Sequence, residues 1–188
     1  WSFIGAFVQG AGAPEWMFFL IPADDYTVRD TWLTAGMRAT GSQDLHIDTV
    51  VPSDALLGGV EGLALPLAQI MPQWLVASYS AVYVGVAQSA VDHGIAYATE
   101  RNLGRLPLVR ARLGRAEAQV AAARLVVLEA ARRVDEAPGT PETNRWIWRA
   151  KLTAGETAME VAASVLEACG TAAMRKGNPL ERIYRDAR

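Results

Sequence analysis

The chain has 188 residues, of which 51% are hydrophobic, with a formal net charge of −2 and a pI of about 5.7. A weakly acidic chain has no broad electrostatic attraction for nucleic acid or anionic lipid, so we expect neither as a partner. The single cysteine, Cys169, has no internal partner for a disulfide. This cysteine usage fits a reducing compartment and a cytoplasmic location.

The first 58 residues predict antiparallel β structure. Short apolar or alternating runs are separated by turn residues, and Pro22 ends the first run as it would end a strand. Gly10, Gly12 and Pro14 predict a hairpin connection. No stretch here is long enough for a helix with an apolar face. The expected strands cover residues 16–22, 26–32 and 45–51, and residues 36–44 form a polar loop.

The next segment is uncharged and predicts the central helix of the fold. From Gly62 to Val91 the sequence contains no Asp, Glu, Lys, Arg or His. Pro66 and Pro72 break its front end, because proline lacks an amide proton and clashes with the preceding turn. Behind Pro72, apolar residues recur at three- and four-residue spacings as far as about Asn102. The opposite face is also apolar or small, so we expect burial on all sides.

Lipid or protein could provide this burial. The run is long enough to span a membrane. However, Gln73, Ser78 and Gln88 dilute it, and basic residues do not flank both of its ends. We therefore expect the helix to lie inside a protein bundle and not in a membrane.

Three further helices are predicted after a break at residues 103–107. The second helix covers about 108–134, and the third starts at a cap formed by Thr140 and Pro141 and stops at Gly170. The fourth begins near Pro179 and is expected to be cut off at Arg188. The sequence thus predicts an α+β fold: a small, partial, antiparallel and β-barrel-like domain (1–58), then an antiparallel up-down helical bundle (59–188), truncated in its last helix.

Residue spacing alone identifies no catalytic or metal-binding motif. The sequence has no Cys/His cluster, no glycine-rich phosphate loop and no nucleophile elbow, so we expect no metal site and nominate no catalytic residue. His46 and His93 are expected to be structural or surface residues, and Cys169 an inert buried thiol. The arginines of the second helix are either a solvated face or a phosphate clamp.

Four stretches of the chain carry a resemblance to a known family. They are WSF (Trp1–Phe3), GMRATGSQDLHIDTVVP (Gly36–Pro52), YATERNLGRLPL (Tyr97–Leu108) and NPLERIYRDAR (Asn178–Arg188). In this order they resemble the middle and C-terminal domains of the acyl-CoA dehydrogenase superfamily, over essentially the whole chain. The last stretch is the most specific match.

This resemblance implies a flavoprotein that acts as an oxidoreductase and forms a homo-oligomer, a dimer or a tetramer. It places the flavin between the β domain and the bundle, with Trp1 and Phe3 at the cofactor and Arg101 reaching its pyrophosphate across a dimer interface. The alternative for Arg101 is an exposed arginine at a helix end. The implied cofactor is FAD or, alternatively, reduced FMN or FAD supplied by a reductase.

Several positions depart from the dehydrogenase pattern. Phe3 stands where these enzymes usually have Thr, Glu100 is near the catalytic glutamate position of some members but out of register, and Cys169 replaces the first glycine of a Gly-Gly pair. Phe3 and the ATGSQD segment (39–44) resemble the reduced-flavin monooxygenase branch.

Three functions therefore stay open. Dehydrogenation of an acyl thioester, with an electron-transfer protein as partner, is narrowly favoured over hydroxylation of a small molecule by a two-component monooxygenase with a flavin reductase. A flavin-free helical interaction module is the third. In the family that WSF resembles, the strand with the tryptophan usually continues into a glycine-containing turn. Phe3 is instead followed directly by Ile4, so we also expect residues to be missing between Phe3 and Ile4.

Overall fold

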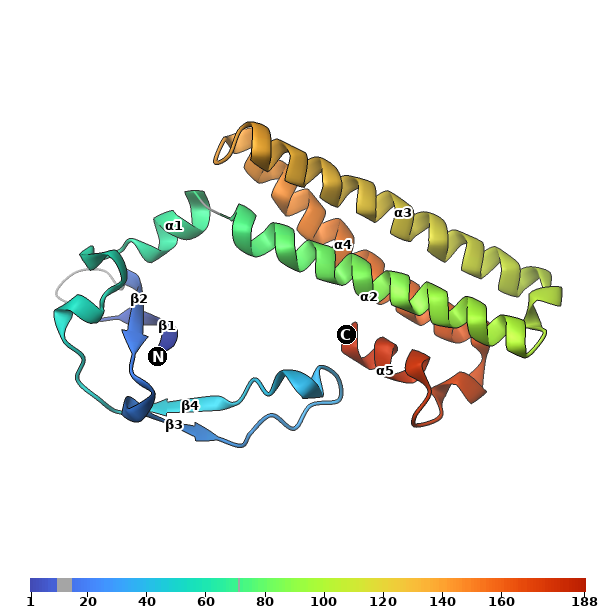
Figure 1. Cartoon of the computed structure of the whole chain (residues 1–188), viewed down its shortest axis with the longest axis horizontal. Helices are drawn as coiled ribbons and strands as arrows, with labels where there is room; N and C mark the ends of the chain where they lie inside the picture. The colour runs from blue at the N-terminus through green and yellow to red at the C-terminus, as the bar shows by residue number, and fades with distance from the viewer. Residues whose placement is uncertain (10–14, 71) are drawn as a thin grey trace. The chain divides into compact units, whose positions relative to one another are not determined.

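The computed structural model describes residues 1–9, 15–70 and 72–188 (Figure 1). The chain divides into two compact units, one of residues 1–34 with 38–71 and one of residues 35–37 with 72–188. The first is built of strands and short helical turns, and the second is a bundle of long helices. The predicted α+β class is confirmed, and the predicted domain boundary after residue 58 stays a prediction.

The first unit contains two separate antiparallel hairpins. β1 (Ser2–Val8) pairs with β2 (Glu15–Ile21), and β3 (Tyr26–Arg29) pairs with β4 (Asp44–Ile47). The antiparallel prediction is confirmed, but the described strands form two two-stranded sheets and no closed barrel. β3 and β4 are shorter than predicted. The expected hairpin connection at 10–14 lies outside the described residues.

β1 passes through Phe3 and Ile4 without interruption. Phe3 pairs with Leu20 and Ile4 with Phe19, so the register continues across the two residues. Exposed and half-buried side chains also alternate along the whole strand. The register of β1 shows no break at this point, and the expectation of missing residues between Phe3 and Ile4 stays a prediction.

Proline lies at or directly before the start of each long helix, but the break predicted at Pro66 is not observed. A short helix, α1 (Ala64–Ile70), carries Pro66 in its first turn, where a missing amide proton is tolerated. α2 (Gln73–Glu100) starts directly after Pro72. It is followed by α3 (Pro107–Glu136), α4 (Pro141–Cys169) and α5 (Pro179–Asp186).

Side-chain caps fix the starts of the last two helices. The Thr140 hydroxyl accepts a hydrogen bond from the Thr143 amide at 3.2 Å, and the Asn178 side chain accepts one from the Leu180 amide at 2.9 Å. α4 ends at Gly170, whose φ of 80° is favourable only for glycine. These caps confirm the predicted start and stop of the third helix and the start of the fourth.

Small residues build the core of the helical unit. α2, α3 and α4 run side by side (Figure 1), and a Cβ atom at Gly94 of α2 would overlap the Val165 side chain of α4. Alanine and valine at buried positions let these helix axes approach closely. The buried positions include Ala87, Ala90 and Val91 on α2, Ala116, Val120 and Ala123 on α3, and Ala154, Val161 and Val165 on α4.

Burial of α2 on all sides is not observed. Tyr79, Val82 and Ile95 are 54%, 59% and 46% exposed. This part of the prediction is wrong because α3, α4 and α5 cover only part of the helix circumference. Among the described helices, none has the length and apolar character needed to cross a membrane.

Candidate functional site

An aromatic face covers one side of the β1–β2 hairpin. The Phe3 and Phe18 rings lie 4.6 Å apart, and Phe7 meets Trp16 edge to face, also at 4.6 Å. The strands can carry four rings because Gly5 lies among them, where a Cβ would come within 2.8 Å of the Trp16 ring. We call Phe3, Phe7, Trp16 and Phe18 the aromatic face.

Phe3 of this face and the neighbouring Trp1 remain open to solvent. Trp1 is 80% exposed and Phe3 is 54% exposed, so neither is a core residue of the described chain. On the other side of β1, the Ser2 hydroxyl donates a hydrogen bond to the Tyr26 hydroxyl at 2.7 Å. Two exposed rings in alternate positions of one strand fit a flat aromatic ligand, because such rings stack on one another. Phe3 offers no hydroxyl to that ligand.

Arg101 lies at the C-terminal end of α2. Its guanidinium carbon is 4.7 Å from the centre of the Tyr97 ring, the side chain is exposed, and no ion pair within the described ranges includes it. The next residue, Asn102, has a left-handed φ of 56° and turns the chain. This geometry leaves donors available for a phosphate, but it also suits an ordinary exposed helix end. Arg101 belongs to the helical unit, and Trp1 and Phe3 belong to the other.

Two of the motifs that carry the family resemblance meet in one clamp. The Arg185 guanidinium donates to the Ala35 carbonyl, and the Asp186 carboxylate accepts from the Met37 amide at 2.7 Å. A Cβ at Gly36 would overlap the Arg185 carbonyl oxygen, so only glycine fits between the two contacts. Residues 35–37 therefore pack against the end of α5, although about 150 positions separate them in the chain.

A neighbour within α5 holds the arginine of this clamp. Arg185 Nε donates to Glu181 Oε1 at 2.6 Å, and this hydrogen bond lowers the pKa of the Glu181 carboxyl. The sequence contained the signals, since GMR and RDAR were both recognised. The contact between them was missed because nothing in either motif specifies its partner.

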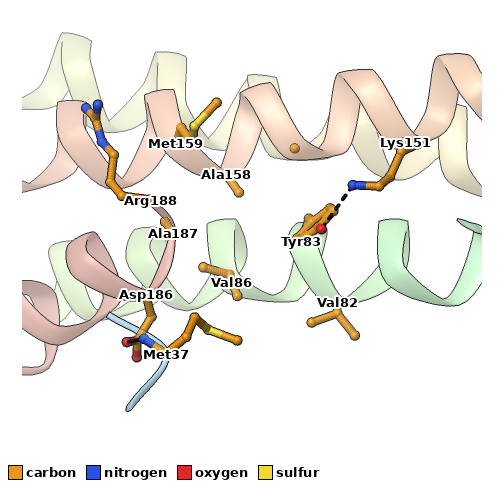
Figure 2. A pocket seen from close by; sticks show the side chains of 11 residues that line it. Met37, Val82, Tyr83, Val86, Lys151, Ala158, Met159, Asp186, Ala187 and Arg188 are labelled. Atoms are coloured by element: carbon orange, nitrogen blue, oxygen red, sulfur yellow. Dashed lines mark hydrogen bonds between the residues drawn. The ribbon is translucent and has the colours of Figure 1, made fainter. Parts of the chain in front are cut away.

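A cavity of about 360 Å³ opens between α2, α4 and the end of α5 (Figure 2). The Lys151 ammonium of α4 donates to the Tyr83 hydroxyl of α2 at 3.0 Å in its wall. Sequence reasoning missed this pair, because Lys151 and Tyr83 lie on different helices and belong to no motif. The remaining lining is Met37, Val82, Val86, Gly155, Ala158, Met159, Asp186, Ala187 and Arg188.

The other nominated residues behave as structural or surface groups. His93 is exposed, with Nδ1 2.8 Å from the Ser89 carbonyl, and His46 is exposed on β4. Cys169 is buried, and burial raises the pKa of its thiol, as expected of an inert cysteine. Glu100 is exposed at the end of α2.

Several arginines of α3 are engaged in ion pairs. Arg112 pairs with Glu167 of α4, while Arg132 and Arg133 both bind Glu129. These contacts favour a solvated face over a phosphate clamp for this set. Within residues 1–9, 15–70 and 72–188, no group of His, Cys, Asp and Glu side chains could hold a metal ion.

Comparisons with known proteins match this architecture. The family model for the C-terminal domain of acyl-CoA dehydrogenases matches residues 76–188. "Putative acyl-CoA dehydrogenase YdbM" of Bacillus subtilis (strain 168) is 31% identical over 179 residues, which are 90% of this chain and 46% of that protein.

Two flavin monooxygenase relatives are also similar. The flavin-dependent monooxygenase oxygenase subunit HsaA of Rhodococcus jostii (strain RHA1) is 27% identical, over 100% of this chain and 56% of that protein. The crystal structure of TdsC from Paenibacillus sp. A11-2 with FMN and indole has a TM-score of 0.78 at 25% identity, over 98% of this chain and 54% of that one. The chain thus spans about half the length of the relatives it matches.

Proposed function

The chain belongs to the acyl-CoA dehydrogenase family, and from this premise we propose that it is part of a flavin-dependent oxidoreductase. The aromatic side chains of β1 are the observation that carries the proposal. Phe3 on β1 and Trp1 directly before it present exposed rings, which is an arrangement that suits the isoalloxazine ring of a flavin.

The described residues fit such a cofactor in two respects. Exposed aromatic surface is available at Trp1 and Phe3, and the donors of Arg101 are free of carboxylates in the described part of the chain. A bound flavin supplies redox chemistry, either by accepting a hydride or, when reduced, by reacting with oxygen. Trp1 and Phe3 would orient its ring and exclude water from one side, and Arg101 would bind the pyrophosphate of a partner subunit's flavin across a dimer interface. The comparisons support a flavin. We propose FAD or, alternatively, reduced FMN or FAD supplied by a reductase.

The reaction we propose first is hydroxylation of a small molecule by a reduced flavin. The sequence alone narrowly favours dehydrogenation, but two observations support the oxygenase. Phe3 offers no hydroxyl to the flavin, and the HsaA relative matches 100% of this chain, so that match includes Trp1 and Phe3. HsaA is named as an oxygenase subunit, and another relative, from Rhizobium, is named an FADH(2)-dependent resorcinol hydroxylase. A separate flavin reductase is the corresponding partner.

Dehydrogenation of an acyl thioester is the second candidate. It is supported by the family match over 76–188 and by the 31% identity to YdbM. An electron-transfer protein would then be the partner. No described side chain is proposed as its catalytic base.

Oligomerisation and location complete the proposal. Leu125 and Leu128 of α3 are three positions apart and are 68% and 58% exposed, and exposed apolar side chains that form a large patch usually mark an interface. We propose a homodimer or a tetramer built from dimers. A monodisperse monomer in light scattering at micromolar concentration would contradict this.

The unpaired, buried Cys169 supports a cytoplasmic location.

Flavin titration tests the proposal. The protein that carries this chain is titrated with oxidised and reduced FMN and FAD under anaerobic conditions, followed by absorbance and fluorescence. An oxygenase should bind the reduced flavin more tightly and consume oxygen when a reductase and NADH are added. A dehydrogenase should retain oxidised FAD, which an acyl-CoA bleaches without oxygen. A protein that binds no flavin in either state would instead be the helical interaction module.

A further inference from the structure

The cavity between α2, α4 and α5 has mainly apolar walls around one half-buried ammonium group (Figure 2). Val82 and Val86 of α2 and Met159 of α4 line it, and Lys151 lies at one end. The cavity volume of about 360 Å³ lies within the range of about 300–1,000 Å³ that is typical of small-molecule sites. The cavity lies wholly within the helical unit.

The charge of Lys151 lacks an anionic partner among the described residues. Its Nζ atom donates to the Tyr83 hydroxyl at 3.0 Å and lies 4.4 Å from the centre of the same ring, and none of the described ion pairs includes it. An ammonium has three donor hydrogens, and the Tyr83 hydroxyl keeps its own hydrogen to donate. Partial removal of an ammonium from water is unfavourable unless an anion compensates for it. The site is therefore complementary to an anion.

The other ionisable side chains of the cavity lie at the far end. Figure 2 shows Asp186 and Arg188 away from Lys151, and the Asp186 carboxylate already accepts from the Met37 amide at 2.7 Å. Apart from Tyr83, which contacts Lys151, the other described lining residues are apolar or glycine. An anion at Lys151 would therefore not meet the Asp186 charge directly, and its hydrocarbon part would lie on the apolar walls.

The cation of this cavity is a lysine ammonium, which suits a small ligand. The chain has two lysines, Lys151 and Lys176, and all its other basic side chains except the two histidines are arginines. A lysine ammonium is a compact point charge, whereas arginine carries a planar fork that needs more room. A single carboxylate entering a cavity of this size matches the lysine.

We propose that this cavity binds a small apolar carboxylic acid. Its carboxylate accepts hydrogen bonds from Lys151 Nζ and from the Tyr83 hydroxyl, and its hydrocarbon body packs on Val82, Val86 and Met159. The proposal uses no flavin and no residue of the first unit, so it stands apart from the proposed oxidoreductase activity.

Binding of two matched probes to the 188-residue chain tests the site. Cyclohexanecarboxylate and cyclohexylmethanol share a ring and differ in charge, and both are titrated while amide shifts are followed by NMR. We expect the acid to bind at least about tenfold more tightly than the alcohol, as a charge-assisted hydrogen bond provides. The shifted amides should lie in residues 82–86 and 151–159.

Three variants locate the interaction. Lys151→Met should weaken binding of the acid about tenfold and leave binding of the alcohol unchanged. Lys176→Met, at the chain's other lysine, is the matched control and should change neither affinity. Gly155→Leu should abolish binding of both probes, because a Cβ at Gly155 has no neighbour closer than 4.0 Å and a larger side chain would fill the cavity.

Four results would overturn the proposal. They are no binding of the acid at millimolar concentration, equal affinity for acid and alcohol, unchanged acid affinity in Lys151→Met, and binding that survives Gly155→Leu. If Lys151→Met fails to fold, Gly155→Leu still tests whether the acid binds in this cavity. That variant should fold, since leucine is a better helix former than the glycine it replaces. The acid-to-alcohol ratio in the parent chain then decides the role of charge.

Discussion

The two units of this chain use their apolar residues in different ways. In the helical unit, small residues such as Ala87, Ala123 and Ala154 are buried where α2, α3 and α4 meet. In the first unit, two-stranded sheets expose large rings, including Trp1 and Phe7 at 80% and 68%. Two-stranded hairpins have little stability on their own. We infer that the helices supply most of the stability and that the hairpin provides surface for binding.

The largest expected effect tests the helical half of this comparison. Ile147 of α4 is completely buried, so Ile147→Ala should remove about 2–5 kcal/mol from the free energy of unfolding, measured with urea. Leu152→Ala on the same helix is the control. Leu152 is 62% exposed, and its loss should cost at most about 0.5 kcal/mol. Equal losses in the two variants would mean that burial on α4 does not determine stability.

The helical half was also the part that the sequence predicted best. Apolar spacing located α2, α3 and α4. Thr140 and Gly170 marked the ends of α4, because helix capping depends only on residues that are near in sequence. The expected burial of α2 failed at Tyr79 and Val82, because spacing shows that a face is apolar but does not show what covers it.

The first unit and the candidate site were harder to predict. Strands were placed, but the pattern could not show that β1–β2 and β3–β4 remain separate sheets, since pairing depends on distant residues. Lys151 and Tyr83 were missed for the same reason, because they lie on different helices and meet only in the folded bundle. The family resemblance nominated Trp1 and Phe3, and their role at a flavin stays a prediction.

The second prediction concerns the clamp between residues 35–37 and α5. Gly36→Ala should force this segment away from the Arg185 carbonyl, breaking the hydrogen bond from the Met37 amide to Asp186. Loss of that bond should speed hydrogen exchange of the Met37 amide by about tenfold, with little change in global stability. Gly104→Ala is the control, since a Cβ there meets nothing within 4 Å. Unchanged exchange in Gly36→Ala would show that the clamp is not needed to hold the segment.

The third prediction tests the hairpin as a binding surface. Trp1→Ala should weaken flavin affinity by on the order of 1 kcal/mol, the contribution of one aromatic pair beyond its buried area. The melting temperature without flavin should stay the same, because Trp1 is 80% exposed. Flavin titration and thermal melting of the protein that carries this chain measure both quantities. A large drop in melting temperature with unchanged flavin affinity would refute the assignment of Trp1 to the cofactor.

The smallest expected effect is the pH dependence of one ion-pair cluster on α3. Hydrogen bonds from Arg132 and then Arg133 lower the pKa of Glu129 from its usual 4.5 to about 2. A carboxyl whose pKa is lower in the folded state stabilises the fold above its unfolded pKa, and the gain is lost as the pH falls through the folded value. Stability should therefore decline between about pH 4.5 and pH 2. The decline should be shallow, because water screens these exposed charges.

Glu129→Gln isolates this contribution. The variant removes the ionisable group, so its urea midpoint should fall less steeply over that pH window than the midpoint of the parent chain. Glu117→Gln is the matched control, because Glu117 is an exposed glutamate of the same helix that takes part in none of the described ion pairs. Parallel pH curves for Glu129→Gln and the parent would show that the cluster decorates α3 without stabilising it. The stability of the helical unit would then depend on its buried core more than on this cluster.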